Sequence, residues 1–450
     1  MFLGDLKDIT YKFTKSSVTY SSPWRLWIGP KLILIFDDPE NIKIISNNPY
    51  DFKRSKHYDF VKPYFGNGLI TAPASMWKIH RAMLGPVFKQ KMFSTYMAGV
   101  VKNSNILATI LETYNGKNVD IMKNILSCTL NIIFDCLLDC NLDLQNNSEI
   151  KYAEYAEKGI VIIMERMMKI WLHPDFIFNI SPQRKRLQKL RLNIDNITYE
   201  IIRKKKELMK EGNILQESKG VDENKIRSPF LEVLLTSLYK GGEYSEKDIR
   251  DEMNTFIFAG SETSANAIAF LFLMLATFPK IQNQAYQELY DMYGSSDDPI
   301  TLEDTKKMEY LERVIKETLR LFPSIPLIGR TASRDMKVNE NLVIPKDCYV
   351  LISIIGLHRK EKNWKNPLTF DPDRFLPGNF DKKYFLPFSR GIRNCIGQDF
   401  AMLEMKIIAA TILRKFTLHT DYAVSIEDIK LKFGVTSHPA EPIILRFYKR

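Results

Sequence analysis

The sequence predicts a mainly α-helical protein with small β-sheets, an α+β fold built as a single large domain over residues 1–450. Helical periodicity fills most of the chain, whereas strand-like alternation occurs only in short pieces. The 450 residues are 45% hydrophobic, which is enough to bury a large core. The chain has no Gly/Ser-rich or Pro-rich linker and no repeat period, so we expect one domain.

The first elements expected are a β-hairpin and a series of amphipathic helices. Residues 24–36 alternate as a hairpin does, with a turn at 28–31, after an N-terminal remnant of residues 1–23. Helical patterns then run from Pro39 to about Met209. They are interrupted at Pro63, Pro73, Pro86 and Pro174. The polar, aperiodic segment from Glu211 to Pro229 is expected to be a surface loop.

A much longer helix is expected over residues 246–278. Ser245 and Asp248 have the spacing of a capping box at its start, and Pro279 ends it. A helix of this length requires a central, packed position. Beyond it we expect a helix at 302–321, strands at 342–344 and 349–354, and a coil from 364 to 387.

Charge and composition limit the partners. The formal net charge of +11 is compatible with an acidic partner protein, an anionic membrane surface or nucleic acid, and equally with a lysine-rich surface that binds no partner. Nucleic acid is disfavoured, because the basic runs at 184–186 and 203–206 lie on polar helix faces and do not alternate with aromatic residues. Charged residues begin as early as Asp5, so neither a signal peptide nor a membrane span is expected there.

The cysteine pattern is not that of a disulfide framework or a zinc site. The five cysteines form an odd set without a CxxC pair, as is typical of a protein in a reducing compartment. Cys128, Cys136 and Cys140 share helical spacing in an apolar stretch and are expected to pack as small hydrophobic residues.

Cys395 lies in a different context, the segment Phe388–Gly397 just before a helical pattern. A helix N-terminus favours a thiolate. Gly391 and Gly397 allow the backbone to approach a flat ligand, and Arg393 can bind a carboxylate. The alternatives are a core cysteine and a nucleophilic cysteine, but none of the six histidines has a context that indicates a catalytic base.

The middle of the long helix also carries an unusual string, Ala259-Gly260-Ser261-Glu262-Thr263-Ser264. Glycine inside a helix costs about 1 kcal/mol relative to alanine, so something must offset it. Thr263 can bond back to the Ala259 carbonyl and open a small groove in the helix. A helix crossing that needs small residues is the alternative interpretation.

Together these segments resemble the cytochrome P450 superfamily over nearly the whole chain from Trp24 onward. Phe388, Gly391, Arg393, Cys395 and Gly397 match its haem-binding loop without a gap. The resemblance implies haem b, iron protoporphyrin IX, with the Cys395 sulfur as axial ligand of the iron. Thiolate ligation favours O–O cleavage, so the implied activity is a monooxygenase that uses O2 and electrons from NADPH.

The same resemblance assigns roles to further residues. The helix string resembles the oxygen-activation motif, which implies proton transfer by Glu262 and Thr263 and haem contacts from Ala259 and Gly260. Haem propionates are expected to be bound by Trp77, Arg81, His358, Arg359 and Arg393. Glu317, Arg320 and Arg374 match a buried structural network below the haem. His57 and His80 match no motif and are expected not to be ligands.

Within the superfamily the register is most similar to the family 4 clan, of insect-like type. This implies a lipophilic substrate such as a fatty acid, a steroid-like molecule or a xenobiotic. Substrate contacts are expected at residues 62–74, 162–178, 256–259, 324–328 and 435–436. Many family 4 members attach haem covalently through a glutamate where this chain has Ala259, so covalent attachment is not expected.

The resemblance also implies partners and a location. NADPH–cytochrome P450 reductase, and cytochrome b5 as a second donor, would bind a basic face around Arg390, Arg393 and Lys406. The N-terminal anchor typical of eukaryotic members is missing, yet the cytosolic face of the endoplasmic reticulum membrane is the expected location. Residues 171–178 form either a peripheral membrane patch or part of the substrate mouth.

Two other functions stay open. The chain could be a catalytically degenerate haem-binding paralogue that its missing anchor separates from the reductase. The other is a cysteine hydrolase, which would be active without haem.

Overall fold

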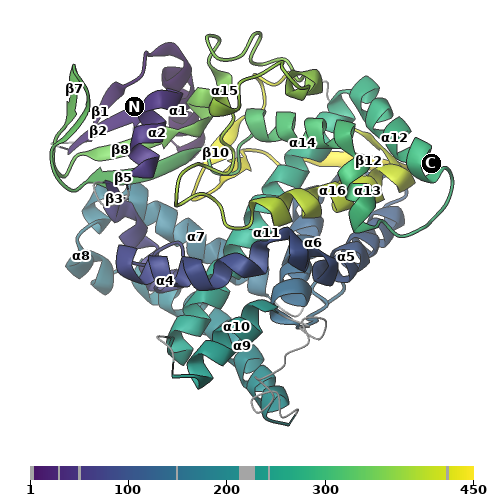
Figure 1. Cartoon of the computed structure of the whole chain (residues 1–450), viewed down its shortest axis with the longest axis horizontal. Helices are drawn as coiled ribbons and strands as arrows, with labels where there is room; N and C mark the ends of the chain where they lie inside the picture. The colour runs from purple at the N-terminus through teal and green to yellow at the C-terminus, as the bar shows by residue number, and fades with distance from the viewer. Residues whose placement is uncertain are drawn as a thin grey trace. The chain divides into compact units, whose positions relative to one another are not determined.

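The computed structural model describes residues 5–28, 31–48, 52–147, 151–211, 229–241, 244–421 and 425–450 (Figure 1). These residues form two compact units. The first unit contains residues 1–56, 104–125 and 263–450, and the second contains residues 57–103 and 126–262. The turn expected at 28–31 and the loop expected at 211–229 rest on residues 29–30 and 212–228, which lie outside the described residues.

The first unit holds all the described strands. They are β1 Trp24–Ile28, β2 Lys31–Phe36, β3 Phe52–Arg54, β4 Val119–Asp120, β5 Leu327–Ala332, β6 Met336–Asn339, β7 Leu342–Ile344, β8 Tyr349–Ser353, β9 Phe416–His419, β10 Leu431–Phe433, β11 Ser437–Pro439 and β12 Ile444–Lys449. The largest sheet has the order β1-β2-β8-β5-β3, in which only β2 and β8 run parallel. The smaller sheets are β4-β12-β9, β10-β11 and β6-β7.

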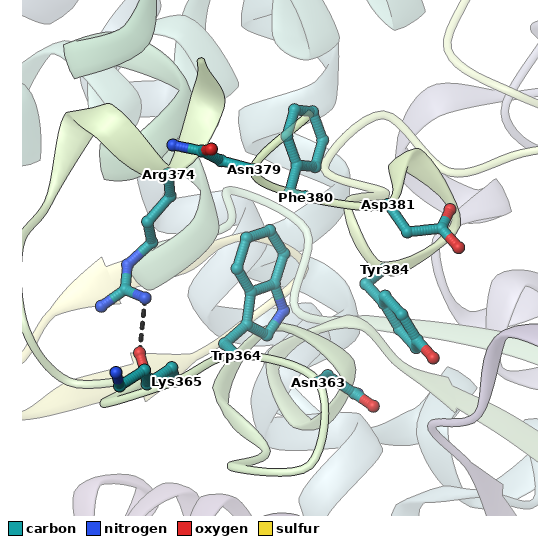
Figure 2. A pocket seen from close by; sticks show the side chains of 8 residues that line it. All are labelled: Asn363, Trp364, Lys365, Arg374, Asn379, Phe380, Asp381 and Tyr384. Carbon is teal, nitrogen blue, oxygen red and sulfur yellow. Dashed lines mark hydrogen bonds between the residues drawn. The ribbon is translucent and has the colours of Figure 1, made fainter. Parts of the chain in front are cut away.

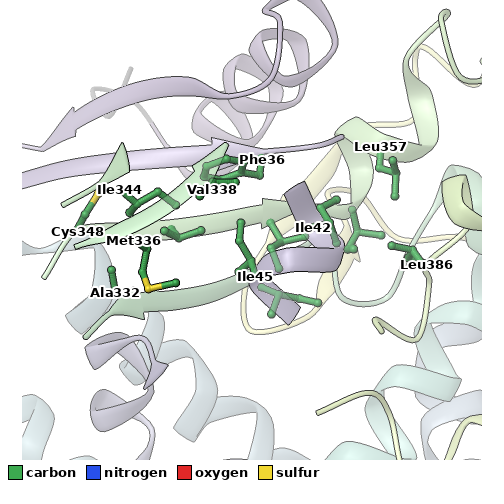
Figure 3. Close-up of a cluster of buried hydrophobic side chains, with 14 residues drawn as sticks. Phe36, Ile42, Ile45, Ala332, Met336, Val338, Ile344, Cys348, Leu357 and Leu386 are labelled. Carbon is green, nitrogen blue, oxygen red and sulfur yellow. The ribbon is translucent and has the colours of Figure 1, made fainter. Parts of the chain in front are cut away.

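The helices of the first unit lie before, between and after these strands in the sequence. They are α1 Leu6–Thr19, α2 Pro39–Asn47, α12 Pro279–Tyr293, α13 Leu302–Lys307, α14 Glu309–Leu321, α15 Ile354–Arg359 and α16 Gln398–Lys415, with short 3-10 turns at Pro372–Phe375 and Lys382–Tyr384. One core cluster joins α2 to the large sheet: Ile42 and Ile45, one turn apart on α2, pack with Phe36 of β2 and Val350 of β8 (Figure 3).

The described residues of the second unit contain helices and 3-10 turns and no strand. It contains α3 Lys62–Phe65, α4 Ala74–Leu84, α7 Tyr152–Met168, α8 Asp175–Ile180, α9 Pro182–Glu211 and α10 Pro229–Tyr239, and 3-10 turns at Gly85–Phe88, Gln90–Met92 and Ile170–Leu172. Three helices, α5 Phe93–Thr113, α6 Ile121–Leu138 and α11 Glu246–Thr277, and the 3-10 turn Lys56–Phe60 have residues in both units.

Most local predictions are confirmed. β1 pairs with β2 as the expected hairpin, and β7 and β8 match the strands expected at 342–344 and 349–354. The capping box of α11 is present, because the Asp248 amide donates to Ser245 Oγ at 3.2 Å and the Ser245 amide donates to Asp248 Oδ2 at 2.9 Å. The predominance of helix over strand also agrees with the predicted α+β fold.

The prediction of a single helix at 302–321 is wrong. The chain forms two helices that break at Met308, whose backbone leaves the helical region. The physical reason lies on α12, where the Glu288 carboxylate accepts hydrogen bonds from the amides of Tyr310 (2.6 Å) and Leu311 (2.9 Å). This long-range cap starts a new helix where the local pattern favours continuation.

Candidate functional site

The cysteine loop, Phe388–Gly397, is held in one conformation by its own backbone. The Cys395 amide donates to the Phe388 carbonyl at 3.0 Å, and the Asn394 amide donates to the Gly391 carbonyl at 3.1 Å. Gly391 has a φ of +77°, and a Cβ there would lie 2.5 Å from the carbonyl oxygen of Ser46 on α2. Only glycine satisfies both conditions, so this residue docks the loop on α2.

Cys395 differs from the other cysteines in exposure. Cys128, Cys136 and Cys348 are buried and Cys140 is partly buried, whereas Cys395 is exposed. It lies three residues before the first residue of α16, at the N-terminal end of that helix, where the helix dipole is positive. A thiol presented on a rigid loop has the chemistry of a ligand for a soft or borderline metal, and a cysteine that only filled the core would be covered. The loop therefore fits a haem iron bound through sulfur.

Glu317, Arg320 and Arg374 lie together in the first unit. Glu317 and Arg320 have no solvent exposure, and Arg320 donates two hydrogen bonds to the Glu317 carboxylate at 2.7 and 2.8 Å. Arg374 Nε donates to Glu317 Oε1 at 3.3 Å. The Asp371 amide also donates to Glu317, at 3.0 Å, so one carboxylate joins α14 to the coil that precedes the cysteine loop.

Arg374 also holds the coil through main-chain carbonyls. Figure 2 shows it reaching the Lys365 carbonyl, and it donates to the Asn366 carbonyl at 2.8 Å. The indole of Trp364 lines the same cavity as Arg374, and the guanidinium of Arg320 lies 5.1 Å from the centre of the indole ring. The cavity at this point has a volume of about 100 Å³, below the roughly 300–1,000 Å³ of pockets for drug-sized ligands, so it is not the substrate site.

His358 is tied to the main chain on both sides of its ring. Its Nδ1 lies 3.2 Å from the Arg320 carbonyl, and its Nε2 accepts from the Leu386 amide at 2.9 Å. Burial, together with the charge of Arg320, lowers the pKa of His358 to about 3, so the ring is neutral. Both ring nitrogens thus bond to main-chain groups, and the propionate contact that the resemblance assigned to His358 stays a prediction.

Arg359 and Arg393 are half-buried in the first unit. Arg359 Nε donates to the Leu321 carbonyl at 3.0 Å, and its guanidinium lies 5.4 Å from the centre of the Phe322 ring. Arg393 lies in the cysteine loop, two residues before Cys395. Both stay predicted propionate ligands, because a guanidinium has five donors and can bind a carboxylate in addition to a carbonyl.

The second unit positions Trp77 and Arg81 on α4. The two residues are four apart and therefore share one face of the helix; Trp77 is buried and Arg81 is half-buried. His80, in the same turn of α4, contacts the Glu252 carboxylate through Nδ1. Trp77 and Arg81 stay predicted propionate ligands, and His80 has a different partner.

The small residues of α11 pack closely against α6. A Cβ on Gly260 would lie 2.5 Å from Cδ1 of Ile133, and Thr129 Oγ1 donates to the Ser261 carbonyl at 3.0 Å. Ala259 and Glu262 are half-buried beside them. Close helix packing, one of the two interpretations of this string, therefore offsets the cost of Gly260. The expected groove and the proton-transfer role of Glu262 stay predictions.

Thr263 begins the part of α11 that belongs to the first unit. Its carbonyl accepts a hydrogen bond from Ser324 Oγ at 2.8 Å, just before β5. The next residue, Ser264, faces Glu404 of α16, a fully buried carboxyl group. Burial raises the pKa of Glu404 to about 8. Sequence reasoning missed Glu404, although an acid among the apolar residues of α16 was a visible signal.

Comparison with known proteins decides the family. A family model described as "Cytochrome P450" matches residues 1–446. The chain belongs to the cytochrome P450 family. It is 33% identical to "Cytochrome P450 4V2" of Mus musculus, over 99% of this chain and 87% of that protein. It is also 31% identical to "Cytochrome P450 4c21" of Blattella germanica, over 94% and 85%.

Solved P450 structures have the same fold. A crystal structure of a cytochrome P450 (CYP102L1) is 25% identical and superposes with a TM-score of 0.84, over 99% of both chains. The haem domain of cytochrome P450DA, 23% identical, has a TM-score of 0.83 over 98% of this chain and 93% of that one. The expected P450 fold and the resemblance to family 4 are confirmed, and the family and fold are those of monooxygenases with a haem cofactor.

The prediction that Lys406 belongs to a basic face of this P450 is wrong. Lys406 is 7% exposed, and its ammonium group bonds to the Glu312 carboxylate at 2.6 Å and to the Thr305 carbonyl at 2.7 Å. It therefore joins α16 to α13 and α14 in the interior and is not available to a redox partner. Helical position alone did not distinguish the two faces of α16, because Glu312 lies far away in the sequence.

The stretches expected to contact substrate fall into both units. Residues 62–74, 162–178 and 256–259 belong to the second, and residues 324–328 and 435–436 belong to the first. Within the second unit, Ile163 and Phe178 are fully buried, and Phe258 contacts Phe65 with ring centres 4.8 Å apart. The stretch 62–74 thus packs directly on α11 at the residue before Ala259.

Proposed function

We propose that the protein is a haem-thiolate monooxygenase that inserts one oxygen atom from O2 into a lipophilic substrate, a fatty acid in the first instance, with electrons from NADPH delivered by a reductase. The observation that carries the proposal is the exposed Cys395 thiol on a loop that Gly391 docks against α2. The family membership supports it, and so do relatives named as family 4 P450s.

Haem bound at Cys395 would supply the activation of O2, because a thiolate ligand pushes electron density onto the iron. The residues of this chain would bind and orient the cofactor and hold protons. Arg359, Arg393, Trp77 and Arg81 would bind its propionates. Glu262 carboxylate and Thr263 hydroxyl would hold the protons that the reaction consumes.

The segment Ile170–Ile180 supports a peripheral membrane contact. Ile170, Trp171, Phe176 and Ile180 are 58–79% exposed, as a lipid-facing patch requires, and side chains lining a substrate mouth would be more covered. Buried Arg166 holds the segment through bonds to the Leu172 carbonyl (3.0 Å) and Asp175 (2.6 Å). We therefore favour the membrane interpretation, at the cytosolic face of the endoplasmic reticulum.

No further membrane contact follows from helix composition. Two helices of the described residues, α6 and α11, are long and apolar enough to span a bilayer, but 67% and 78% of their apolar windows are buried inside the structure. Core helices of soluble proteins pass the same test. The reductase would bind a surface that includes Arg390 and Arg393, which are partly exposed.

The test is a carbon-monoxide difference spectrum of the reduced protein, followed by incubation with NADPH, reductase and lauric acid in phospholipid vesicles. We expect the red-shifted Soret band of thiolate ligation and hydroxylated laurate. A thiolate band without NADPH-dependent oxygen use would replace the proposal with the degenerate paralogue. Hydrolase activity without any haem band would overturn it altogether.

A further inference from the structure

The loop Gly66–Ala72 is bound by two consecutive acids of α11, all within the second unit. The Asn67 amide donates to Asp251 Oδ2 at 2.8 Å, and the Leu69 amide donates to Glu252 Oε2 at 3.0 Å. The loop turns at this point, with the Thr71 and Ala72 amides donating to the Gly68 carbonyl at 2.9 and 2.8 Å, and its two amides at positions 67 and 69 each bind one of the neighbouring carboxylates. We call this arrangement the carboxylate clamp.

The loop is shaped to reach the clamp. Gly66 has a φ of +74°, and a Cβ there would lie 2.0 Å from the Asp251 carboxyl group. A Cβ on Gly68 would lie 2.0 Å from Thr255 Oγ1. Thr71 Oγ1 then donates to the Gly66 carbonyl at 2.7 Å and closes the loop on itself. Both glycines are required because the backbone passes directly over α11.

The charge of Asp251 is balanced by a buried network. Arg250 contacts both Asp251 and Asp195 of α9, and all three side chains are at most 9% exposed. Arg191, also on α9, donates to the Pro63 carbonyl at 2.8 Å, just before the loop. The clamp is thus joined to α9 as well as to α11, and a buried charge of this kind is costly unless it is paired.

Glu252 serves two partners with its two oxygens. Oε2 accepts from the loop at Leu69, and Oε1 contacts His80 Nδ1 on α4, the helix that carries Trp77 and Arg81. Tyr244 stacks on the His80 ring, with ring centres 4.3 Å apart. Glu252 and His80 are 0% and 4% exposed. One carboxylate therefore fixes both the loop and the helix.

The register of α11 relates the clamp to the expected haem contacts. Glu252 and Ala259 are seven residues apart, which is close to two helical turns, so they lie on the same face; Asp251 and Glu262, eleven apart, lie on another shared face. The clamp thus fixes the loop over the same faces of α11 that carry the residues predicted to act in oxygen activation.

We infer that Asp251 and Glu252 are positioning residues that set the substrate-side loop Gly66–Ala72, and that Glu252 simultaneously fixes α4 through His80. The inference rests on the proposed function for the statement that this loop faces substrate. Neither acid contacts the reacting atoms; each acts through the backbone it holds. A change at the clamp therefore alters how a long apolar substrate lies, and with it the carbon that is oxidised.

The experiment compares Glu252→Gln, which keeps an acceptor for Leu69 and offers an amide donor to the unprotonated Nδ1 of His80, with Glu252→Met, which keeps the volume and removes both bonds. Gly66→Ala displaces the loop while both acids remain. Gly294→Ala is the matched control, because Gly294 also has a positive φ (+57°) but open space around its Cβ position.

Two measurements are made on the haem-loaded full chain. Amide hydrogen exchange of residues 66–72 reports the clamp itself, whatever the substrate. Laurate titration of the haem spectrum and the distribution of hydroxylated products report substrate positioning. Glu252→Met and Gly66→Ala are expected to lose protection at residues 66–72, bind laurate about tenfold more weakly, as loss of roughly 1.4 kcal/mol would cause, and shift the product distribution. Glu252→Gln and the control are expected to resemble the wild type.

The outcomes separate the two proposals. Unchanged exchange at residues 66–72 in Glu252→Met overturns the clamp, and so does lost protection with wild-type laurate affinity and product distribution, because the acids would then be structural only. A wild-type protein without a thiolate band or without laurate turnover counts against the proposed function, while the exchange measurement still decides whether the clamp holds the loop.

Discussion

Arg320 donates two hydrogen bonds to the Glu317 carboxylate one helical turn away, in a place where neither side chain meets solvent. Sequence spacing alone describes an ordinary surface pair worth a few tenths of a kcal/mol. Burial makes the pair more important for the stability of the fold, because removing one partner leaves the other charge unpaired in the interior. The Glu317 carboxylate also accepts hydrogen bonds from Arg374 and from the Asp371 amide, and these bonds hold the coil before the cysteine loop.

Glu317→Gln is expected to destabilise the folded protein by about 3–5 kcal/mol and to lower the ratio of bound haem to protein, because the coil loses its anchor. Urea unfolding and the pyridine haemochrome assay measure the two effects. Glu303→Gln is the control, since Glu303 forms an exposed pair with Lys306 on α13. Equal behaviour of the two variants would show that the Glu317 network does not support the site.

Gly391→Ala is expected to disrupt the cysteine loop more than its small size indicates. The added Cβ would press on the Ser46 carbonyl as well as strain a left-handed backbone. Gly378→Ala provides the control, because Gly378 has a similar φ of +87° and nothing near its Cβ position. We expect loss of the thiolate Soret band in the first variant and its retention in the second; a retained band in both would mean that α2 does not hold the loop.

Cys395→Ser is expected to abolish the red-shifted carbon-monoxide band, because a hydroxyl is a poor ligand for haem iron compared with a thiolate. The control is Cys348→Ser, a buried cysteine in the core of the first unit that lies outside the cysteine loop. A thiolate-type spectrum that survives in Cys395→Ser would assign the iron ligand to another residue.

Thr263→Ala is expected to separate oxygen consumption from product formation, so that most of the NADPH yields reduced oxygen species and little product. The reason is the loss of the hydroxyl predicted to hold a proton near the reacting oxygen. Thr277→Ala, at the end of the same helix, removes a hydroxyl that donates to the Leu273 carbonyl of its own helix and should leave coupling unchanged. Wild-type coupling in Thr263→Ala would remove this residue from the mechanism.

The parts of the structure that sequence predicted are those with local causes. The β1–β2 hairpin follows from strand alternation, and the start of α11 follows from Ser245 and Asp248, which lie within one turn. The cysteine loop was identified because its glycines, arginine and cysteine are contiguous. In each case the residues that determine the structure are neighbours in the sequence, so pattern and geometry coincide.

The parts that sequence missed depend on distant residues. Glu288 divides the helix expected at 302–321, and Glu312 draws Lys406 into the interior. His80 and Glu252 are 172 positions apart, and neither lies in a motif that predicts the other. Periodicity reports which face of a helix is apolar, but it does not report which buried polar group finds a partner, and that decides these contacts.

Glu404 supplies a prediction with a defined pH dependence. Its pKa is raised to about 8 because the carboxyl group is fully buried, and a hydrogen bond with Ser264 offsets this effect only in part. An unfolded chain ionises at the ordinary value near 4.5, so between about pH 4.5 and 8 the folded state binds more protons than the unfolded state. Folding stability attributable to this group is therefore greatest in acid and falls as pH rises to about 8.

Glu404→Gln should remove this slope, because the amide does not ionise. We expect the variant to gain stability relative to the wild type at pH 8, by an amount on the order of a few kcal/mol, with a much smaller difference at pH 5. Urea unfolding at several pH values measures it. Since His358 contributes an opposite slope below its ordinary pKa near 6.5, the comparison is between variant and wild type at each pH. A constant difference across the range would mean that Glu404 is ionised in the folded protein.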